Sequence, residues 1–130
     1  MSLDALGIAG TGLTLHRKWL DAVADNIANA NTVTATSGDA FQARYIVAQE
    51  AQDGNGAEVA GVAYGKAEGI LTYEPDNPLA DTEGYVRRPD IDMGGQMAQM
   101  IMAQRSYQAN LSVVDRARES YQAAIQLGKG

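Results

Sequence analysis

The N-terminal residues of the chain show apolar side chains at a helical spacing. Four large aliphatic residues recur every seven positions: Leu6, Leu13, Leu20 and Ile27. A second row stands three positions after three of them, with His16 interrupting it: Ala9, Val23 and Ala30. This pattern predicts an amphipathic helix of about four heptads. Because its apolar stripe is narrow, such a helix needs a partner to be stable.

The C-terminal residues repeat the pattern and supply that partner. One face follows a three-four spacing: Met97, Met100, Tyr107, Leu111, Val114, Tyr121 and Ile125. Ile101, Ala117 and Ala124 widen this face, and it also includes Gln104 and Arg118, polar residues that a larger assembly can use to fix register. We therefore predict that the two terminal helices pair as an antiparallel coiled coil.

The middle of the chain has a different composition. Neither Gly nor Pro occurs from Leu13 to Ser37 or from Gln96 to Leu127, whereas nine of the 14 Gly and all three Pro lie in residues 38–95. Short strands are expected at Phe41–Val47, Ile70–Tyr73 and Tyr85–Arg87, and Gln49–Glu58 is expected to be an exposed loop.

These patterns define a fold class and a division into domains. We expect a mainly α fold with a small β middle, in which long terminal helices flank an irregular, β-rich insertion. Residues 1–37 and 96–130 would form a discontinuous helical domain, and residues 38–95 a small β and loop insertion. Net charge follows the same division, since residues 38–95 hold 11 acidic and four basic side chains whereas residues 96–130 hold two acidic and four basic ones.

Composition excludes several functional classes. A net charge of -6 and a pI of about 4.6 argue against nucleic-acid binding, which needs clustered Lys and Arg. The absence of Cys and the single His16 argue against a zinc site. No stretch resembles a cleaved signal peptide or a membrane span, so no membrane insertion is expected. No cofactor and no small-molecule substrate are expected either.

Two candidate ligand sites fit simpler structural roles better. Asp90 and Asp92 resemble the start of a calcium loop, but Gly94 and Ile101 stand where two further ligands would be required. Acidic residues just before a helix more often cap it. Glycines at positions 7, 10 and 12 reverse the dinucleotide-binding spacing, so we attribute them to close helix packing.

Three asparagines cluster near the expected end of the first helix: Asn26, Asn29 and Asn31. Asparagine terminates helices readily, because it tolerates left-handed backbone and bonds local backbone groups. The same side chains could instead form lateral hydrogen bonds between subunits. Both interpretations are compatible with the sequence.

Three segments carry a family resemblance: Leu20–Thr32 (LDAVADNIANANT), Tyr73–Met93 (YEPDNPLADTEGYVRRPDIDM) and Ala103–Asn110 (AQRSYQAN). Together they resemble the flagellar rod and hook family, and the second resembles a segment particular to a proximal rod protein. The resemblance implies a non-enzymatic subunit that assembles with copies of itself, with other rod proteins and with the export and MS-ring junction. It also implies export without a cleaved signal into the periplasm-spanning rod, and leaves the role of residues 49–66 open.

The resemblance and the two apolar stripes together predict an assembly interface on the terminal helices. It comprises the four heptad residues, Val23, the three asparagines and the seven residues of the C-terminal stripe. Three alternatives remain at this point: another rod or hook-family axial subunit, a soluble helical-hairpin interaction module, and an enzyme that uses Asp90 and Asp92.

Overall fold

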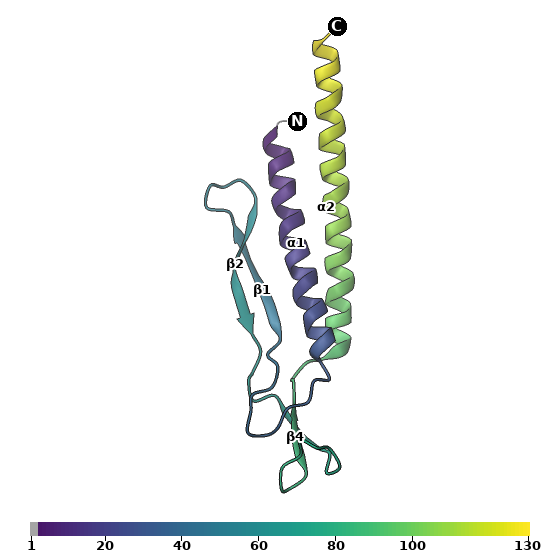
Figure 1. The fold of residues 1–130 in the computed structure, drawn as a ribbon. Coiled ribbons are helices and arrows are strands. Elements are labelled where there is room, and N and C mark those ends of the chain that lie inside the picture. Colours follow the sequence, from purple (N-terminus) through teal and green to yellow (C-terminus); the bar gives the residue numbers. More distant parts are fainter. Residues whose placement is uncertain (1–2) are drawn as a thin grey trace.

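The computed structural model describes residues 3–130 as two long helices and two β-hairpins (Figure 1). The elements follow one another in the order α1 (Leu3–Asn29), β1 (Arg44–Glu50), β2 (Ala57–Tyr64), β3 (Ile70–Tyr73), β4 (Tyr85–Arg88) and α2 (Met93–Gly128). The two helices run side by side in opposite directions, and the start of α1 and the end of α2 lie toward the same end of the molecule. This arrangement confirms the predicted fold class of paired terminal helices with a small β middle.

Each helix begins or ends at a residue that satisfies free backbone groups. Asp92 is the N-cap of α2, and its carboxylate accepts a hydrogen bond from the Gly95 N–H at 3.2 Å. This confirms the expected capping role of Asp92. At the end of α1, the Asn29 carboxamide donates to the Asp25 carbonyl at 2.9 Å, and the Asn29 carbonyl accepts from the Thr32 N–H at 3.0 Å.

The contact between the helices, which we call the seam, consists mostly of small and polar side chains, together with Trp19 and Val23. Ala103 and Asn26 are 0% exposed, and α1 is the only element of residues 3–130 that packs along α2. A Cβ atom on Gly12 would collide with the Asn110 carboxamide, so the helices approach closely there. The seam comprises Gly12, Trp19, Val23 and Asn26 of α1 and Gln96, Ala103, Asn110 and Ala117 of α2.

The seam differs from the one that the apolar stripes predicted. Of the predicted residues, Val23 is buried, whereas Met97 is 55% exposed and Leu111 40% exposed. Gln104 and Arg118 are exposed as well. The reason is a shift of one residue along α2: Gln96, Ala103 and Asn110 face α1 in place of Met97, Gln104 and Leu111. One residue corresponds to about 100° around a helix, which turns the large side chains to the flank of the pair.

The β1–β2 hairpin covers part of α1. Its strands are antiparallel, with Arg44 opposite Tyr64 and a bulge between Val47 and Ala48. The prediction of a loop over residues 49–58 was wrong at both ends, because β1 continues to Glu50 and β2 begins at Ala57. The expected strand at residues 41–47 likewise begins later, at Arg44.

The β3–β4 hairpin closes the end of the molecule opposite the termini (Figure 1). It pairs Tyr73 with Tyr85, which confirms both short strands predicted there. Arg87 connects this hairpin to the segment after α1, because its backbone N–H and C=O both bond to Thr34 at 2.9 Å. The Arg87 side chain donates to the Thr36 carbonyl at 2.9 Å and also to the Glu68 carbonyl.

Two carboxylates in the turns of this hairpin are held ionised by hydrogen bonds. Hydrogen bonds from Asn77 and from Arg88 lower the pKa of Glu74. The backbone N–H of Tyr85 lowers the pKa of Asp81, and the Glu83 N–H adds to the effect. Both groups organise local turns rather than a reactive site.

The core of the single chain is thin. Its solvent-accessible surface is 8451 Å², compared with about 6,600 Å² expected for a compact monomer of this mass. Within residues 4–130, six of the eight buried apolar residues are alanines, and Val86 is the largest that is fully buried. No helix within residues 3–130 combines the length and the apolar character that crossing a membrane requires.

Candidate assembly surface

The large apolar residues of both helices lie together on one flank of the pair, which we call the outer face. On α1, the heptad residues Leu13, Leu20 and Ile27 each follow a seam residue by one position. Met97 and Leu111 do the same on α2, and Leu6 continues the heptad toward the start of α1. A step of one residue along a helix turns the side-chain direction by about 100° around its axis. Because the two helices are antiparallel, this turn leads to the same side of the pair on both, so the two stripes lie on one flank. The outer face comprises Leu6, Leu13, Leu20, Ile27, Met97, Met100, Ile101 and Leu111.

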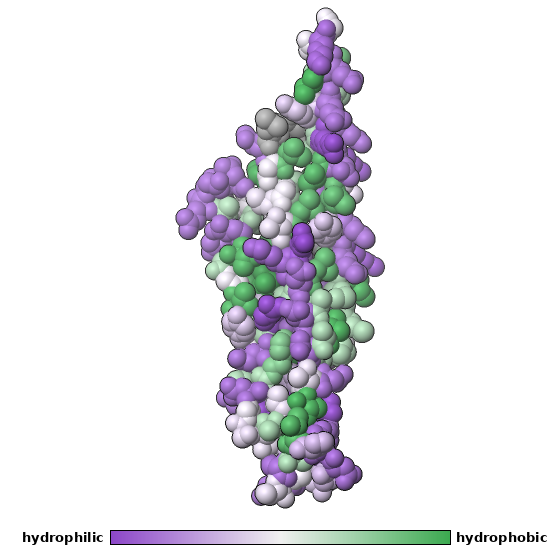
Figure 2. Space-filling model, in the orientation of Figure 1, coloured by the Kyte–Doolittle hydropathy of each residue, from purple (hydrophilic) through white to green (hydrophobic). Residues whose placement is uncertain are grey.

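A shallow hollow shows that the two stripes meet where the end of α1 lies beside the start of α2. It is lined by Ala24, Ile27 and Ala28 of α1 and by Met97, Met100, Ile101 and Gln104 of α2. The aliphatic residues of the α1 heptad are half-buried, and those of α2 are mostly exposed. On the side of the molecule drawn in Figure 2, hydrophobic side chains are exposed in several patches along its length. A monomer that functions alone rarely exposes so much apolar surface.

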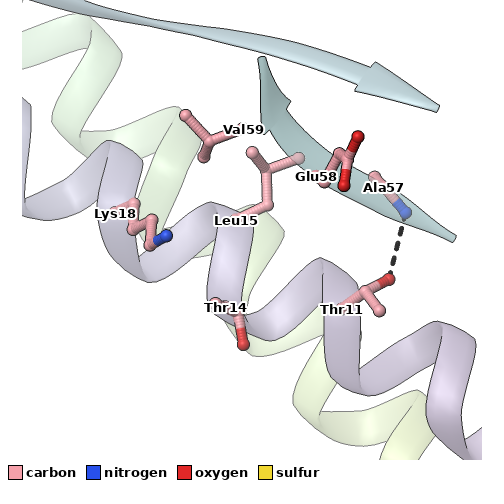
Figure 3. A pocket seen from close by; sticks show the side chains of 7 residues that line it. All are labelled: Thr11, Thr14, Leu15, Lys18, Ala57, Glu58 and Val59. Carbon is pink, nitrogen blue, oxygen red and sulfur yellow. Dashed lines mark hydrogen bonds between the residues drawn. The ribbon is translucent and has the colours of Figure 1, made fainter. Parts of the chain in front are cut away.

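The β1–β2 hairpin lies on the other flank of α1. The Thr11 hydroxyl accepts a hydrogen bond from the Ala57 N–H at 3.1 Å, and the Leu15 side chain points toward Val59 (Figure 3). Trp19 donates from its indole nitrogen to Gln99 Oε1 at 3.1 Å. The hairpin therefore covers one side of the helix pair and leaves the outer face open.

The C-terminal end of α2 has no partner helix within the described residues 3–130. With 36 residues against 27, α2 extends past the start of α1, as Figure 1 shows. Two residues of the predicted interface, Tyr121 and Ile125, are exposed on this extension, and Leu127 is 84% exposed. The other two, Tyr107 and Val114, are half-buried beside the seam.

The three asparagines have three different surroundings. Asn29 stabilises the end of α1, as predicted, and Asn31 is exposed just beyond it. Asn26 does neither of the things expected of it, because it is completely buried inside the chain. Its carboxamide donates to the Arg44 carbonyl at 2.9 Å and to Gln96 Oε1 at 3.1 Å, and accepts from the Arg44 N–H at 2.8 Å. Asn26 is therefore not exposed to a neighbouring subunit in this structure, contrary to its place in the predicted interface.

The remaining polar candidates have structural roles. Asp92 caps α2, and Asp90 is exposed beside it. Within residues 3–130, no three His, Asp or Glu side chains converge as metal ligands would. Of the predicted packing glycines, only Gly12 lies against another element, since added Cβ atoms on Gly7 and Gly10 would meet open space.

Comparison with known families assigns both terminal helices to one class of protein. Residues 6–36 match the model described as "Flagella basal body rod protein", and residues 82–127 match "Flagellar basal body rod FlgEFG protein C-terminal". The first matched segment contains most of α1, and the second contains β4 and nearly all of α2. The class is therefore that of the flagellar rod proteins.

Curated relatives narrow the assignment. The chain is 38% identical to the flagellar basal-body rod protein FlgC of Salmonella typhimurium over 131 aligned residues, which cover 98% of each chain. It is 35% identical to FlgC of Agrobacterium fabrum, over 94% of this chain and 91% of the relative, and 26% identical to FlgC of Bacillus subtilis, over 98% and 99%. The chain belongs to the FlgC family of flagellar basal-body rod proteins. It is a structural subunit of the basal-body rod.

Proposed function

We propose that the chain builds the proximal rod by packing the outer faces of its helices against copies of itself and against other rod proteins. Its discontinuous helical domain, residues 1–37 and 96–130, forms the assembly body, and residues 38–95 form an insertion beside it. Head-to-tail contacts between identical subunits generate an open helical filament rather than a closed dimer. The resulting rod transmits torque and needs no catalytic group.

The observation that carries this proposal is the reversal of burial between the seam and the outer face. Burial of one Leu or Met side chain provides about 1.5 to 3 kcal/mol. The single chain leaves much of this free energy unused, because Met97, Ile101 and Leu111 are each at least 40% exposed. Neighbouring subunits that cover the outer face and the end of α2 would recover it.

The proposed location is the periplasm-spanning rod, reached by flagellar export without removal of an N-terminal signal. The first subunits of such a rod would adjoin the export and MS-ring junction. The N-terminal heptad supports this proposal, since its first residue, Leu6, already belongs to the outer face. Cleavage near the N-terminus would remove part of the assembly surface, so the N-terminal mass of subunits in purified rods tests the proposal.

Replacement of outer-face residues by aspartate tests the assembly role. We expect Met97→Asp and Leu111→Asp subunits to keep their helix content and melting temperature, because both side chains are exposed in the single chain. They should nevertheless be absent from purified basal bodies and leave the cells non-motile. Leu13→Asp subunits should also be absent from basal bodies. Because the Leu13 side chain is half-buried, this variant should in addition lose stability, unlike the other two. Circular dichroism of the purified chain and immunoblots of basal bodies measure the two effects.

A charge reversal away from the outer face provides the control. Glu50→Lys changes the exposed end of β1, and incorporation should remain normal. The assembly surface is not where we place it if Glu50→Lys blocks incorporation while Met97→Asp and Leu111→Asp subunits still enter the rod.

A further inference from the structure

The β1–β2 hairpin is attached to the helices very differently at its two ends. At its base, the Arg44 N–H and C=O both bond to the Asn26 carboxamide, at 2.8 and 2.9 Å. The Arg44 guanidinium also forms an ion pair with Asp25, and Asn26 bonds onward to Gln96 of α2 at 3.1 Å. Because Asn26 is 0% exposed, the base of the hairpin is tied to both helices at one buried point.

The turn end of the hairpin is held much more weakly. Its only hydrogen bond to α1 among the described residues joins the Ala57 N–H to the Thr11 hydroxyl, at 3.1 Å. Gly56 allows this approach, since a Cβ atom there would collide with Thr11. Residues 52–55 beyond it are exposed. This single, partly buried hydrogen bond contributes only about 1 kcal/mol of net free energy.

Between these two ends the hairpin and α1 are poorly packed. Three hollows of about 180, 310 and 310 Å³ lie between them, lined by side chains that include Leu15, Ile46, Val59 and Val62. These hollows are open clefts at the surface, so the hairpin and α1 do not bury a continuous apolar surface along this stretch.

We propose that the β1–β2 hairpin is a hinged arm, which pivots at the Asn26–Arg44 contact and is released from α1 at the Thr11–Ala57 contact. The bulge between Val47 and Ala48 allows β1 to bend between the two ends. In the released state the arm carries apolar side chains away from α1. Its use in fitting an adjoining subunit rests on the proposed rod function, whereas the motion itself belongs to the single chain.

Spin-label distances in the full chain test the hinge, because the chain contains no native cysteine. One pair of labels at Thr14 and Asn55 reports on the turn end, and a second pair at Asp21 and Tyr64 reports on the base. We expect two distances for the first pair and one for the second. Thr11→Val should raise the ratio of long to short distances in the first pair about fivefold, as loss of one hydrogen bond predicts, and leave the second unchanged.

Two controls make each outcome decisive. Thr11→Ser keeps the hydroxyl acceptor and should reproduce the wild-type distances. A third pair, at Ala28 and Gln104, measures the helix contact. A single short Thr14–Asn55 distance in both wild type and Thr11→Val, with a defined Ala28–Gln104 distance, overturns the hinge alone. Equal broadening of the base and turn pairs also overturns it. Loss of a defined Ala28–Gln104 distance overturns the helix pair, and the hinge and the proposed function with it.

Discussion

The seam and the outer face of the helix pair are built from opposite kinds of side chain. The seam uses mostly glycine, alanine, asparagine and glutamine, with Trp19 and Val23 as its large side chains, and Ala103 at its centre is 0% exposed. The outer face uses leucine, isoleucine and methionine, and Met97 on it is 55% exposed. A domain that folds for itself alone buries its large aliphatic residues first. This chain presents them to the outside, where subunits of an assembly can cover them.

We therefore assign different roles to the two surfaces: the seam fixes the register of the helix pair, and the outer face mediates the proposed association between subunits. Polar side chains in a helix contact fix register at some cost in stability, and the bond between Asn26 and Gln96 has this form. Small residues allow the backbones to approach, as at Gly12. Neither contributes much hydrophobic free energy, so we expect the single helix pair to be only modestly stable. In the proposed assembly, burial of the outer face would add the missing free energy.

The largest expected effect comes from a charge placed in the seam. Ala103→Asp would bury an unpaired carboxylate, which should cost about 3 kcal/mol or more. We expect the purified variant to lose much of its helical circular dichroism at room temperature, because a domain of this size has only about 5 to 15 kcal/mol in total.

The adjacent residue provides a matched control for this experiment. Met102 is 57% exposed, so Met102→Asp should change the free energy of unfolding by less than about 0.5 kcal/mol. If Met102→Asp unfolds the chain as readily as Ala103→Asp, the side of α2 that faces α1 is not the one described.

A smaller effect is expected from the buried asparagine. Asn26→Ala removes three hydrogen bonds and leaves the Arg44 backbone groups without partners, at a cost of about 2 to 4 kcal/mol. Asn29→Ala removes only exposed bonds at the helix end and should cost about 1 kcal/mol or less. Urea unfolding of both variants measures the difference. Equal losses would mean that Asn26 is only a terminator of α1, as its position in the sequence suggests.

Periodicity predicted the helices and their pairing but could not decide which stripe faces the partner. The leucine stripe and the small, polar stripe repeat with the same spacing of seven and lie one residue apart. Hydrophobicity favours burial of the leucines, and that choice is correct when a chain buries its surface internally. It fails here because the seam buries the small and polar stripe and leaves Met97 and Leu111 exposed, which agrees with the proposed contact to other subunits. Whether the same pattern locates the interface between subunits is what the aspartate substitutions on the outer face test.

Long-range polar contacts were beyond the reach of local patterns. Asn26 resembles a helix terminator, and only the fold reveals its bonds to Arg44 and Gln96. The β2 strand was missed because its sequence, AEVAGVAY, is rich in Ala and Gly, which have low strand propensity. Its pairing with β1 stabilises it despite that composition. In contrast, the β3 and β4 strands contain the aromatic and branched residues that strands favour, and both were predicted.

The smallest expected effect concerns the start of α2, about one turn before Gln96, which is the first residue of α2 in the seam. Asp92→Ala removes the N-cap and should cost about 1 kcal/mol, whereas Asp92→Asn preserves a good cap and should cost only a few tenths. Adding Asp90→Asn should change little, because that carboxylate is exposed and no role in the seam depends on it. Thermal unfolding of the purified chain ranks the variants, and motility of the double asparagine variant should remain near normal. Loss of a bound ion or of an activity in the double asparagine variant would show that these two carboxylates do more than begin a helix. A loss of stability for Asp92→Asn as large as that for Ala103→Asp would show that the seam depends on the charge at the first turn of α2.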